Sequence, residues 1–114
     1  MPNTKITAKL SVLGVMSGTS LDGLDLALTE FILKNGQWHF KLKKGICLPY
    51  QATTIEALEQ ATKLDASSLN KLDQKIGTQI GEMISENFEL SEIDFISSHG
   101  HTIFHQPKKG LTLQ

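Results

Sequence analysis

Residues 24–42 most constrain the fold, because two runs of alternating apolar and polar residues flank the pair Asn35-Gly36. Every second residue is apolar in both runs: Leu24, Leu26 and Leu28 before the pair, and Trp38, Phe40 and Leu42 after it. A period of two is typical of strands with one buried face. Asn-Gly supplies the positive φ angles of a type I′ turn. The sequence therefore predicts an antiparallel hairpin, whose first strand extends to about Leu33.

Elements on either side of this hairpin follow from periodicity and capping. The apolar run Leu10–Met16 predicts a buried strand that enters a tight loop of small residues. Thr53 and Glu56 have the spacing of a capping box, which predicts a short helix ending near Thr62.

A second, longer helix is indicated by an apolar stripe with a spacing of three or four residues. Its members are Leu69, Leu72, Ile76, Ile80 and Met83, and Phe88 extends the stripe. Gly77 and Gly81 lie four residues apart on this helix. Each glycine weakens a helix, so close packing against the sheet is the expected reason for them.

Two further strands are predicted near the end of the chain. Ile93–Ser97 has the pattern of a central strand, and Leu111–Gln114 begins another in which the sequence stops. The order strand, strand, strand, helices, strand predicts an α/β fold, with a three-stranded antiparallel meander and a parallel strand reached by a helical crossover. An end inside a strand leaves an unpaired edge, so we expect an incomplete fold: a fragment, or one partner of a larger assembly.

Composition limits the partners. The chain has 114 residues, 39% hydrophobic and 20% charged, which suits one globular domain. Its 11 basic and 12 acidic residues give a net charge of −1, so neither nucleic acid nor an anionic membrane is an expected partner. A small molecule or a protein is expected instead.

The cysteine content and the N-terminus indicate a reducing, cytoplasmic setting. Cys47 is the only cysteine, and its neighbours Ile46 and Leu48 predict a buried, inert thiol without a disulfide. Lys9 interrupts the apolar stretch that a signal peptide needs. No window approaches the roughly 20 apolar residues of a membrane helix.

The loop within Gly14–Asp25 combines glycines, hydroxyl residues and carboxylates. Glycines and small residues let several backbone N–H groups converge on a phosphate. Thr19 and Ser20 add hydroxyl donors, whereas Asp22 and Asp25 suit Mg²⁺ held directly or through water. The loop has neither the Gly-Lys-Ser/Thr of a Walker motif nor the second glycine of a nucleophile elbow. Composition alone also fits a plain tight turn between two strands.

Three histidines, His99, His101 and His105, lie in the segment Ser98–Pro107 after the predicted fourth strand. Alternation along an extended chain would put them on one side, which suits zinc, but no cysteine or nearby acidic residue completes such a site. The other interpretation from the residues alone is a polar loop at the sheet edge where α/β proteins bind ligands.

The segment Met16–Asp25 resembles the ATP-binding motif of the anhydro-N-acetylmuramic acid kinases, which belong to a superfamily with other sugar kinases and actin. The resemblance implies a ribonuclease H-like (actin-like ATPase) half-domain, in which this loop joins the first two strands. It also implies ATP and Mg²⁺ as cofactors, with Asp22 and Asp25 toward the metal. The implied ATP-binding residues are Ser17, Gly18, Thr19, Ser20, Leu21, Asp22, Gly23, Leu24 and Asp25.

The histidine segment resembles a second motif of that family, His-Gly-Gln-Thr followed by a histidine and a proline, which lines the sugar side of the cleft. His99, Gly100 and Thr102 match it and are the implied sugar-binding residues. His101 departs from the usual glutamine, which changes its reach and adds pH dependence.

The implied reaction opens the 1,6-anhydro ring of anhydro-N-acetylmuramic acid with water and phosphorylates O6 from ATP, in peptidoglycan recycling. Residues 1–114 would form the N-terminal part of the first lobe, without the second lobe. The family's aspartate base belongs to a later phosphate loop, so this stretch alone is expected to be inactive. The remainder of a kinase chain is therefore an expected partner, and the full-length protein could form a homodimer. A non-catalytic nucleotide- or sugar-binding module is the alternative. Sugar specificity, oligomeric state and the role of His101 stay open at this level.

Overall fold

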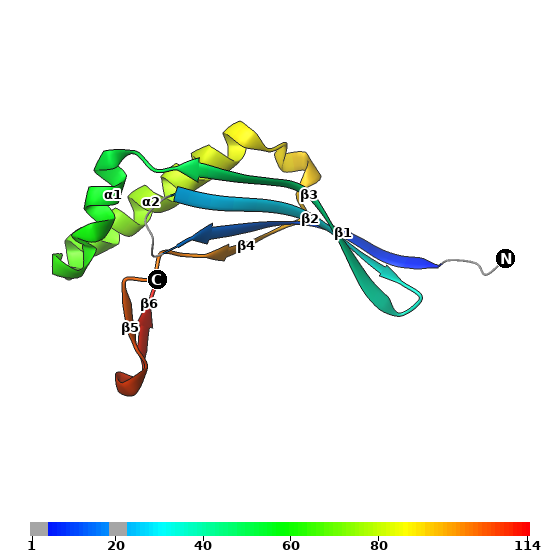
Figure 1. The fold of residues 1–114 in the computed structure, drawn as a ribbon. Coiled ribbons are helices and arrows are strands. Elements are labelled where there is room, and N and C mark those ends of the chain that lie inside the picture. Colours follow the sequence, from blue (N-terminus) through cyan, green and yellow to red (C-terminus); the bar gives the residue numbers. More distant parts are fainter. Residues whose placement is uncertain (1–4, 19–22) are drawn as a thin grey trace.

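The computed structural model describes residues 5–18 and 23–114, which form a mixed α/β arrangement (Figure 1). The strands are β1 (Ile6–Ser17), β2 (Gly23–Lys34), β3 (Gln37–Pro49), β4 (Phe95–His99), β5 (Phe104–Gln106) and β6 (Leu111–Leu113). The α-helices are α1 (Ala52–Glu59) and α2 (Ala66–Asn87), and 3₁₀ turns cover Ala61–Lys63, Leu90–Glu92 and Pro107–Lys109. One sheet has the order β3-β2-β1-β4, and β5 pairs with β6 in a separate hairpin.

The predicted hairpin is confirmed. Asn35 and Gly36 have φ angles of 52° and 76°, as a type I′ turn requires. β1, β2 and β3 pair antiparallel in sequence order, and β4 pairs parallel to β1 after the two helices. The meander and the helical crossover are therefore present as predicted.

Both helices cover the same face of the sheet, which is visible above the strands in Figure 1. The core between the helices and the sheet consists of Leu13, Val15, Leu24, Leu26, Leu28, Tyr50, Leu58, Ile84 and Phe88. Leu24, Leu26 and Leu28 of β2 point into this core, as their alternation predicts. Ile76, Ile80 and Met83 of the predicted stripe pack against it from α2.

Two predictions about the helices are wrong. Thr53 lies inside α1, whose N-cap is Gln51 with no side-chain capping hydrogen bond, so Thr53 and Glu56 do not form a capping box. Gly77 and Gly81 do not mark close packing, because a Cβ at either position would meet nothing within 4 Å. They lie on exposed positions of α2, where the sheet does not reach.

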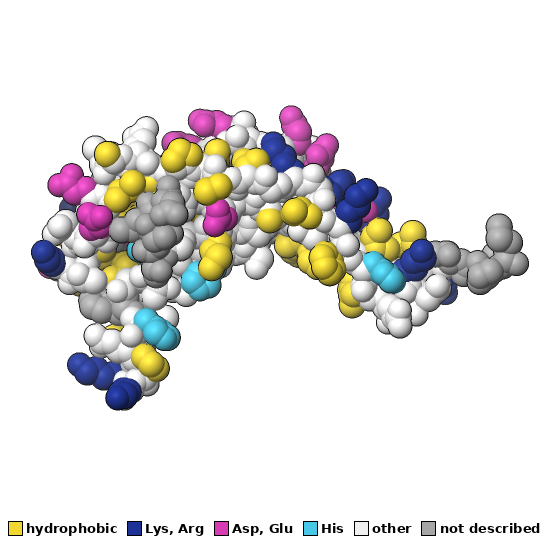
Figure 2. All heavy atoms as spheres, viewed as in Figure 1, with side chains coloured by type: hydrophobic (Ala, Val, Ile, Leu, Met, Phe, Trp, Pro, Cys, Tyr) yellow, Lys and Arg dark blue, Asp and Glu magenta, His cyan; other side chains and the backbone are white. Residues whose placement is uncertain are grey.

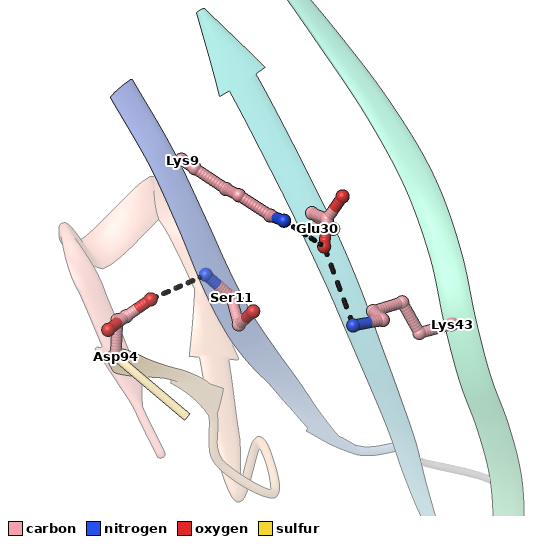
Figure 3. A network of polar contacts seen from close by, with 5 residues as sticks. All are labelled: Lys9, Ser11, Glu30, Lys43 and Asp94. Atoms are coloured by element: carbon pink, nitrogen blue, oxygen red, sulfur yellow. Dashed lines mark hydrogen bonds and ion pairs between the residues drawn. The ribbon is translucent and has the colours of Figure 1, made fainter. Parts of the chain in front are cut away.

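β4 is an edge strand of the described sheet, which corrects the prediction of a central strand. It pairs with β1 on one side and with no described strand on the other. Asp94 fixes its start, as Figure 3 shows: its carboxylate Oδ2 accepts from the Ser11 amide at 2.7 Å. The Asp94 amide in turn donates to the Ser11 carbonyl at 2.8 Å. These two bonds set the register of β4 on β1.

The distal half of the meander extends beyond the helices, and the molecule measures 63 × 37 × 22 Å. Figure 2 shows hydrophobic side chains at the surface of this half. Among them are Trp38, Phe40 and Leu42, and Phe40 is 77% exposed. Glu30 of β2 lies between two lysines. Its Oε2 is 3.7 Å from Nζ of Lys9 and 3.4 Å from Nζ of Lys43 (Figure 3).

The face of the sheet opposite the helices is open. Cys47 lies on it, because it pairs with Asp25, whose neighbours Leu24 and Leu26 point the other way into the core. The thiol is exposed, so the prediction of a buried cysteine is wrong. The apolar residues beside it, Ile46 and Leu48, face the helices instead and pack against the core.

None of the helices in the described ranges is long and apolar enough to span a membrane. The 22 residues of α2 include charged side chains along its exposed side.

Candidate functional site

The two sequence motifs meet at one edge of the sheet. Met16, near the end of β1, pairs with Asp25 of β2 on one side and with His99 of β4 on the other. β1 and β4 are parallel and end together here, and the carboxyl ends of parallel strands are where open α/β sheets bind ligands. Asp25 of the predicted phosphate loop and His99 of the predicted sugar motif therefore lie on the two strands that flank Met16.

A broad groove of about 850 Å³ lies on the open face beside this row. Its lining residues are Gly14, Val15, Met16, Asp25, Leu26, Ala27, Gly45, Ile46, Cys47, Ser97, Ser98 and His99. Gly14, Ala27 and Gly45 pair with one another across β1, β2 and β3, and Ser97 continues the row on β4. These residues have small side chains or none, so the open face is hollow along their row. The larger side chains of the next row, Met16, Asp25, Cys47 and His99, border the hollow.

Ser17 lies at the base of the phosphate loop, on the side facing the helices. Its side chain is 2% exposed, and its Oγ accepts a hydrogen bond of 2.7 Å from the hydroxyl of Tyr50. Burial raises the pKa of Tyr50 above its usual 10.0; the bond to Ser17 acts in the opposite direction, and the negative charge of Asp25 adds to the rise. Tyr50 is therefore a neutral donor at physiological pH.

The far end of the loop is held by packing. A Cβ on Gly23 would lie 2.1 Å from the carbonyl oxygen of Leu48, so β3 leaves room only for glycine. Leu24 is 0% exposed and belongs to the core, so its side chain does not face a ligand. Thr19, Ser20, Leu21 and Asp22 lie outside the described residues, so their contacts with ATP and Mg²⁺ stay predictions.

Gln114, which the sequence analysis did not select, contacts the residues of the predicted sugar motif. The side-chain nitrogen of Gln114 lies 2.8 Å from Nε2 of His99 and donates to Oγ1 of Thr102 at 3.4 Å. Gln114 also approaches Gly100, where a Cβ would be 3.4 Å from its Cβ. The three predicted sugar-binding residues thus surround one amide side chain.

The three histidines of the segment do not lie on one side. His99 lines the open groove, whereas His101 lines a second cavity, of about 480 Å³, between α2 and the β5-β6 hairpin. Nδ1 of His101 is buried there without a hydrogen-bond partner, and His105 bonds Thr112 at 3.0 Å. The chain leaves the extended conformation after His99, so alternation no longer applies. Within the described ranges no three potential ligands are grouped for a metal ion.

Comparison with known proteins confirms the family resemblance. The sequence profile of the anhydro-N-acetylmuramic acid kinases matches residues 10–114. The chain belongs to this family. The anhydro-N-acetylmuramic acid kinase of Bacillus cereus strain Q1 is 35% identical over 105 residues, which cover 85% of this chain and 28% of the relative. That of Bacillus thuringiensis subsp. konkukian strain 97-27 is 34% identical over 106 residues, or 86% of this chain and 28% of the relative. The chain thus spans little more than a quarter of the length of these relatives.

The groove fits the Mg²⁺ that this kinase family implies. Asp25 is exposed and is the one carboxylate among the described residues that line the groove. Mg²⁺ prefers oxygen ligands and retains several waters, so it needs only one or two protein carboxylates beside the phosphates of a nucleotide. Asp25 has the chemistry and the accessibility for this role.

Sequence reasoning predicted the family correctly but missed Tyr50, Gln114 and the small residues of the groove floor. The small residues were detectable, because Gly14 and Ala27 occupy the alternate positions that face away from the core. Tyr50 and Gln114 act across the fold and have no local signal.

Proposed function

We propose that the complete protein carrying this sequence is an ATP-dependent anhydro-N-acetylmuramic acid kinase. Residues 1–114 then form the N-terminal part of its first lobe, within a ribonuclease H-like fold. The observation that carries the proposal is the register at Met16, with Asp25 and His99 on its two sides in one groove. The curated relatives' shared name supports the substrate.

The reaction breaks two bonds and forms two. The oxygen of water bonds to C1 of the sugar as the bond from C1 to O6 breaks, and a base takes the water proton. O6 bonds to the γ-phosphorus of ATP as the bond to the β-γ bridging oxygen breaks. The products are N-acetylmuramic acid 6-phosphate and ADP. Catalysis of such a transfer depends on positioning and on neutralising phosphate charge.

The residues of this chain divide these tasks between the two motifs. Backbone N–H groups around Gly18 and Ser20 are proposed to bind the terminal phosphates. Asp22 and Asp25 would hold Mg²⁺, which neutralises charge on the phosphates when bound. On the opposite side of Met16, His99 and Thr102 are proposed to orient the sugar, with Gln114 holding their side chains in place.

The base that takes the water proton is not proposed to lie within residues 1–114. The family resemblance implies an aspartate from a second phosphate loop, which this stretch does not contain. Residues 1–114 by themselves should therefore bind ligand without turnover. A binding module without chemistry is the alternative function, and it predicts the same behaviour for the complete protein.

The test is phosphorylation of anhydro-N-acetylmuramic acid by the complete protein with Mg·ATP, with the product identified by mass spectrometry. Asp22→Ala should lower kcat/KM for Mg·ATP by about a hundredfold. Its melting temperature should stay within a few degrees of wild type. Glu59→Ala, which removes an exposed carboxylate at the end of α1, is the matched control and should retain activity. Failure of the wild-type protein to form a phosphorylated sugar would falsify the proposal, and full activity in Asp22→Ala would remove the loop from it.

A further inference from the structure

The hydrogen bond between Tyr50 and Ser17 connects the core to the phosphate loop. We propose that Tyr50 is a positioning residue for Mg·ATP binding that acts through Ser17, because it fixes the end of β1 from which the proposed phosphate-binding loop starts. The inference rests on the proposed function, because it assigns a role within the same site. Tyr50 is 7% exposed and belongs to the core, so the role proposed for it is indirect, through Ser17, and not by contact with the nucleotide.

Strand pairing places Tyr50 under both ends of the loop. Ser17, the last residue of β1, pairs with Leu24 of β2, and Gly23 pairs with Pro49 at the end of β3. Tyr50 follows Pro49 directly, and its side chain reaches past β2 to Ser17. One loop end is thus held by the Tyr50 hydroxyl and the other by the packing of Gly23 against β3. Residues 18–22 connect these two fixed points.

The hydroxyl group of Tyr50 contributes a hydrogen bond to Ser17 in addition to the volume that the side chain fills. A phenylalanine would fill the same space but would leave Ser17 Oγ, almost inaccessible to water, without its donor. By accepting from Tyr50, Ser17 keeps its own hydroxyl proton available for a further hydrogen bond. Because Tyr50 keeps its proton at physiological pH, this orientation does not change in that range.

A purely structural role for the bond predicts a different result, and the fold contains a matched control. Oγ1 of Thr54 donates to Oε1 of Gln79 at 3.1 Å, and Thr54 is 5% exposed. This bond also joins two side chains and is partly buried, and Thr54 lies within α1, four residues after Tyr50. It joins α1 to α2, however, and does not reach the loop. Thr54→Val therefore removes a comparable bond without disturbing Ser17.

The experiment compares Tyr50→Phe, Ser17→Ala, the double variant and Thr54→Val in the complete protein. It measures kcat, KM for Mg·ATP, KM for the sugar, melting temperature and the calorimetric affinity for Mg·ATP. Tyr50→Phe should raise KM and the dissociation constant for Mg·ATP by at least about threefold, the loss expected for one hydrogen bond. KM for the sugar should not change. Ser17→Ala should have a similar effect, and the double variant should be no worse than the more affected single one.

Each outcome has a separate meaning. If Tyr50→Phe lowers the melting temperature like Thr54→Val but leaves Mg·ATP binding unchanged, the bond is structural and the inference is overturned. If the wild type binds Mg·ATP without phosphorylating the sugar, the proposed function fails, and the affinity ratio of Tyr50→Phe to wild type still decides the positioning role. If the wild type does not bind Mg·ATP, both the loop assignment and this inference are overturned.

Discussion

Gly23 lies where the phosphate loop returns to the sheet, and the neighbouring strand leaves no space there for a side chain. The obstructing atoms belong to the backbone of Leu48 and Pro49 and cannot rotate away as a flexible side chain would. Gly14, also on the sheet, has its nearest obstruction at an ordinary contact distance of 3.7 Å from a built Cβ. The two glycines therefore have different reasons to be small: steric exclusion at the loop, and an open groove floor on β1.

This difference predicts opposite responses to the same change. Gly23→Ala should lower the free energy of unfolding by at least about 2 kcal/mol, because β2 and β3 must separate to admit the methyl group. Gly14→Ala should change it by less than about 1 kcal/mol. Denaturant unfolding of both variants measures these values. Equal stability of Gly23→Ala and wild type would show that β3 does not pack against the loop end as described.

At the scale of elements, a capping hydrogen bond at its first turn stabilises α2 in addition to its packing against the core. Asp65 is the N-cap, and its Oδ1 accepts from the Ser68 amide at 2.7 Å. The backbone hydrogen bond from Ser68 lowers the pKa of Asp65 below its usual 3.8. Capping satisfies one of the amides that a helix N-terminus leaves without a partner. The helix then holds Ile84 and the partly buried residues of its stripe against the sheet.

Since the pKa of Asp65 is lower in the folded state, its contribution to stability is present above pH 3.8 and is lost as the pH falls through the folded value. Asp65→Ala should therefore destabilise the protein at pH 7, and the gap to wild type should narrow in acid. Asp65→Asn should keep much of the cap without the acid dependence. Melting curves from pH 7 to about pH 3 test this. Asp73→Ala, at an exposed position within the same helix, is the control, and a loss equal to that of Asp65→Ala would contradict the capping role.

At the scale of the whole molecule, the fold brings together residues that are distant in sequence. Asp25 and His99 line the same groove because β4 returns parallel to β1 after both helices. If Asp25 acts on the nucleotide side and His99 on the sugar side, both contribute to one transition state. Residues that act as a unit have non-additive effects on catalysis.

A double-mutant cycle tests this coupling. The loss of kcat/KM in Asp25→Asn/His99→Gln should be smaller than the product of the single losses by at least about threefold. Asp25→Asn combined with His39→Gln should be multiplicative, because His39 lies on β3 near the hairpin turn and does not line the groove. Strict multiplicativity for both pairs would place Asp25 and His99 in separate sites.

Much of the architecture could be predicted because it follows from local patterns. The period of two in β2, the Asn35-Gly36 turn and the leucines of the core are all recovered in the structure. The family resemblance, which the family match over residues 10–114 confirms, was likewise carried by contiguous residues. Predictions that depend on where an element starts or on what packs against it are wrong: Thr53 does not cap α1, and Gly77 and Gly81 do not mark a packing contact.

The amino-acid sequence by itself determined which residues share a face of each strand, because alternation is a property of the backbone. It also determined the family, through two short motifs. Only the tertiary structure decided which face is covered, and hence that Cys47 is exposed and that β4 is an edge strand of the described sheet. Only the tertiary structure brought Tyr50 to Ser17, and only it placed Asp25 and His99 on the two sides of Met16. The physical reason is that burial and hydrogen bonding depend on partners far along the chain, which no local period encodes.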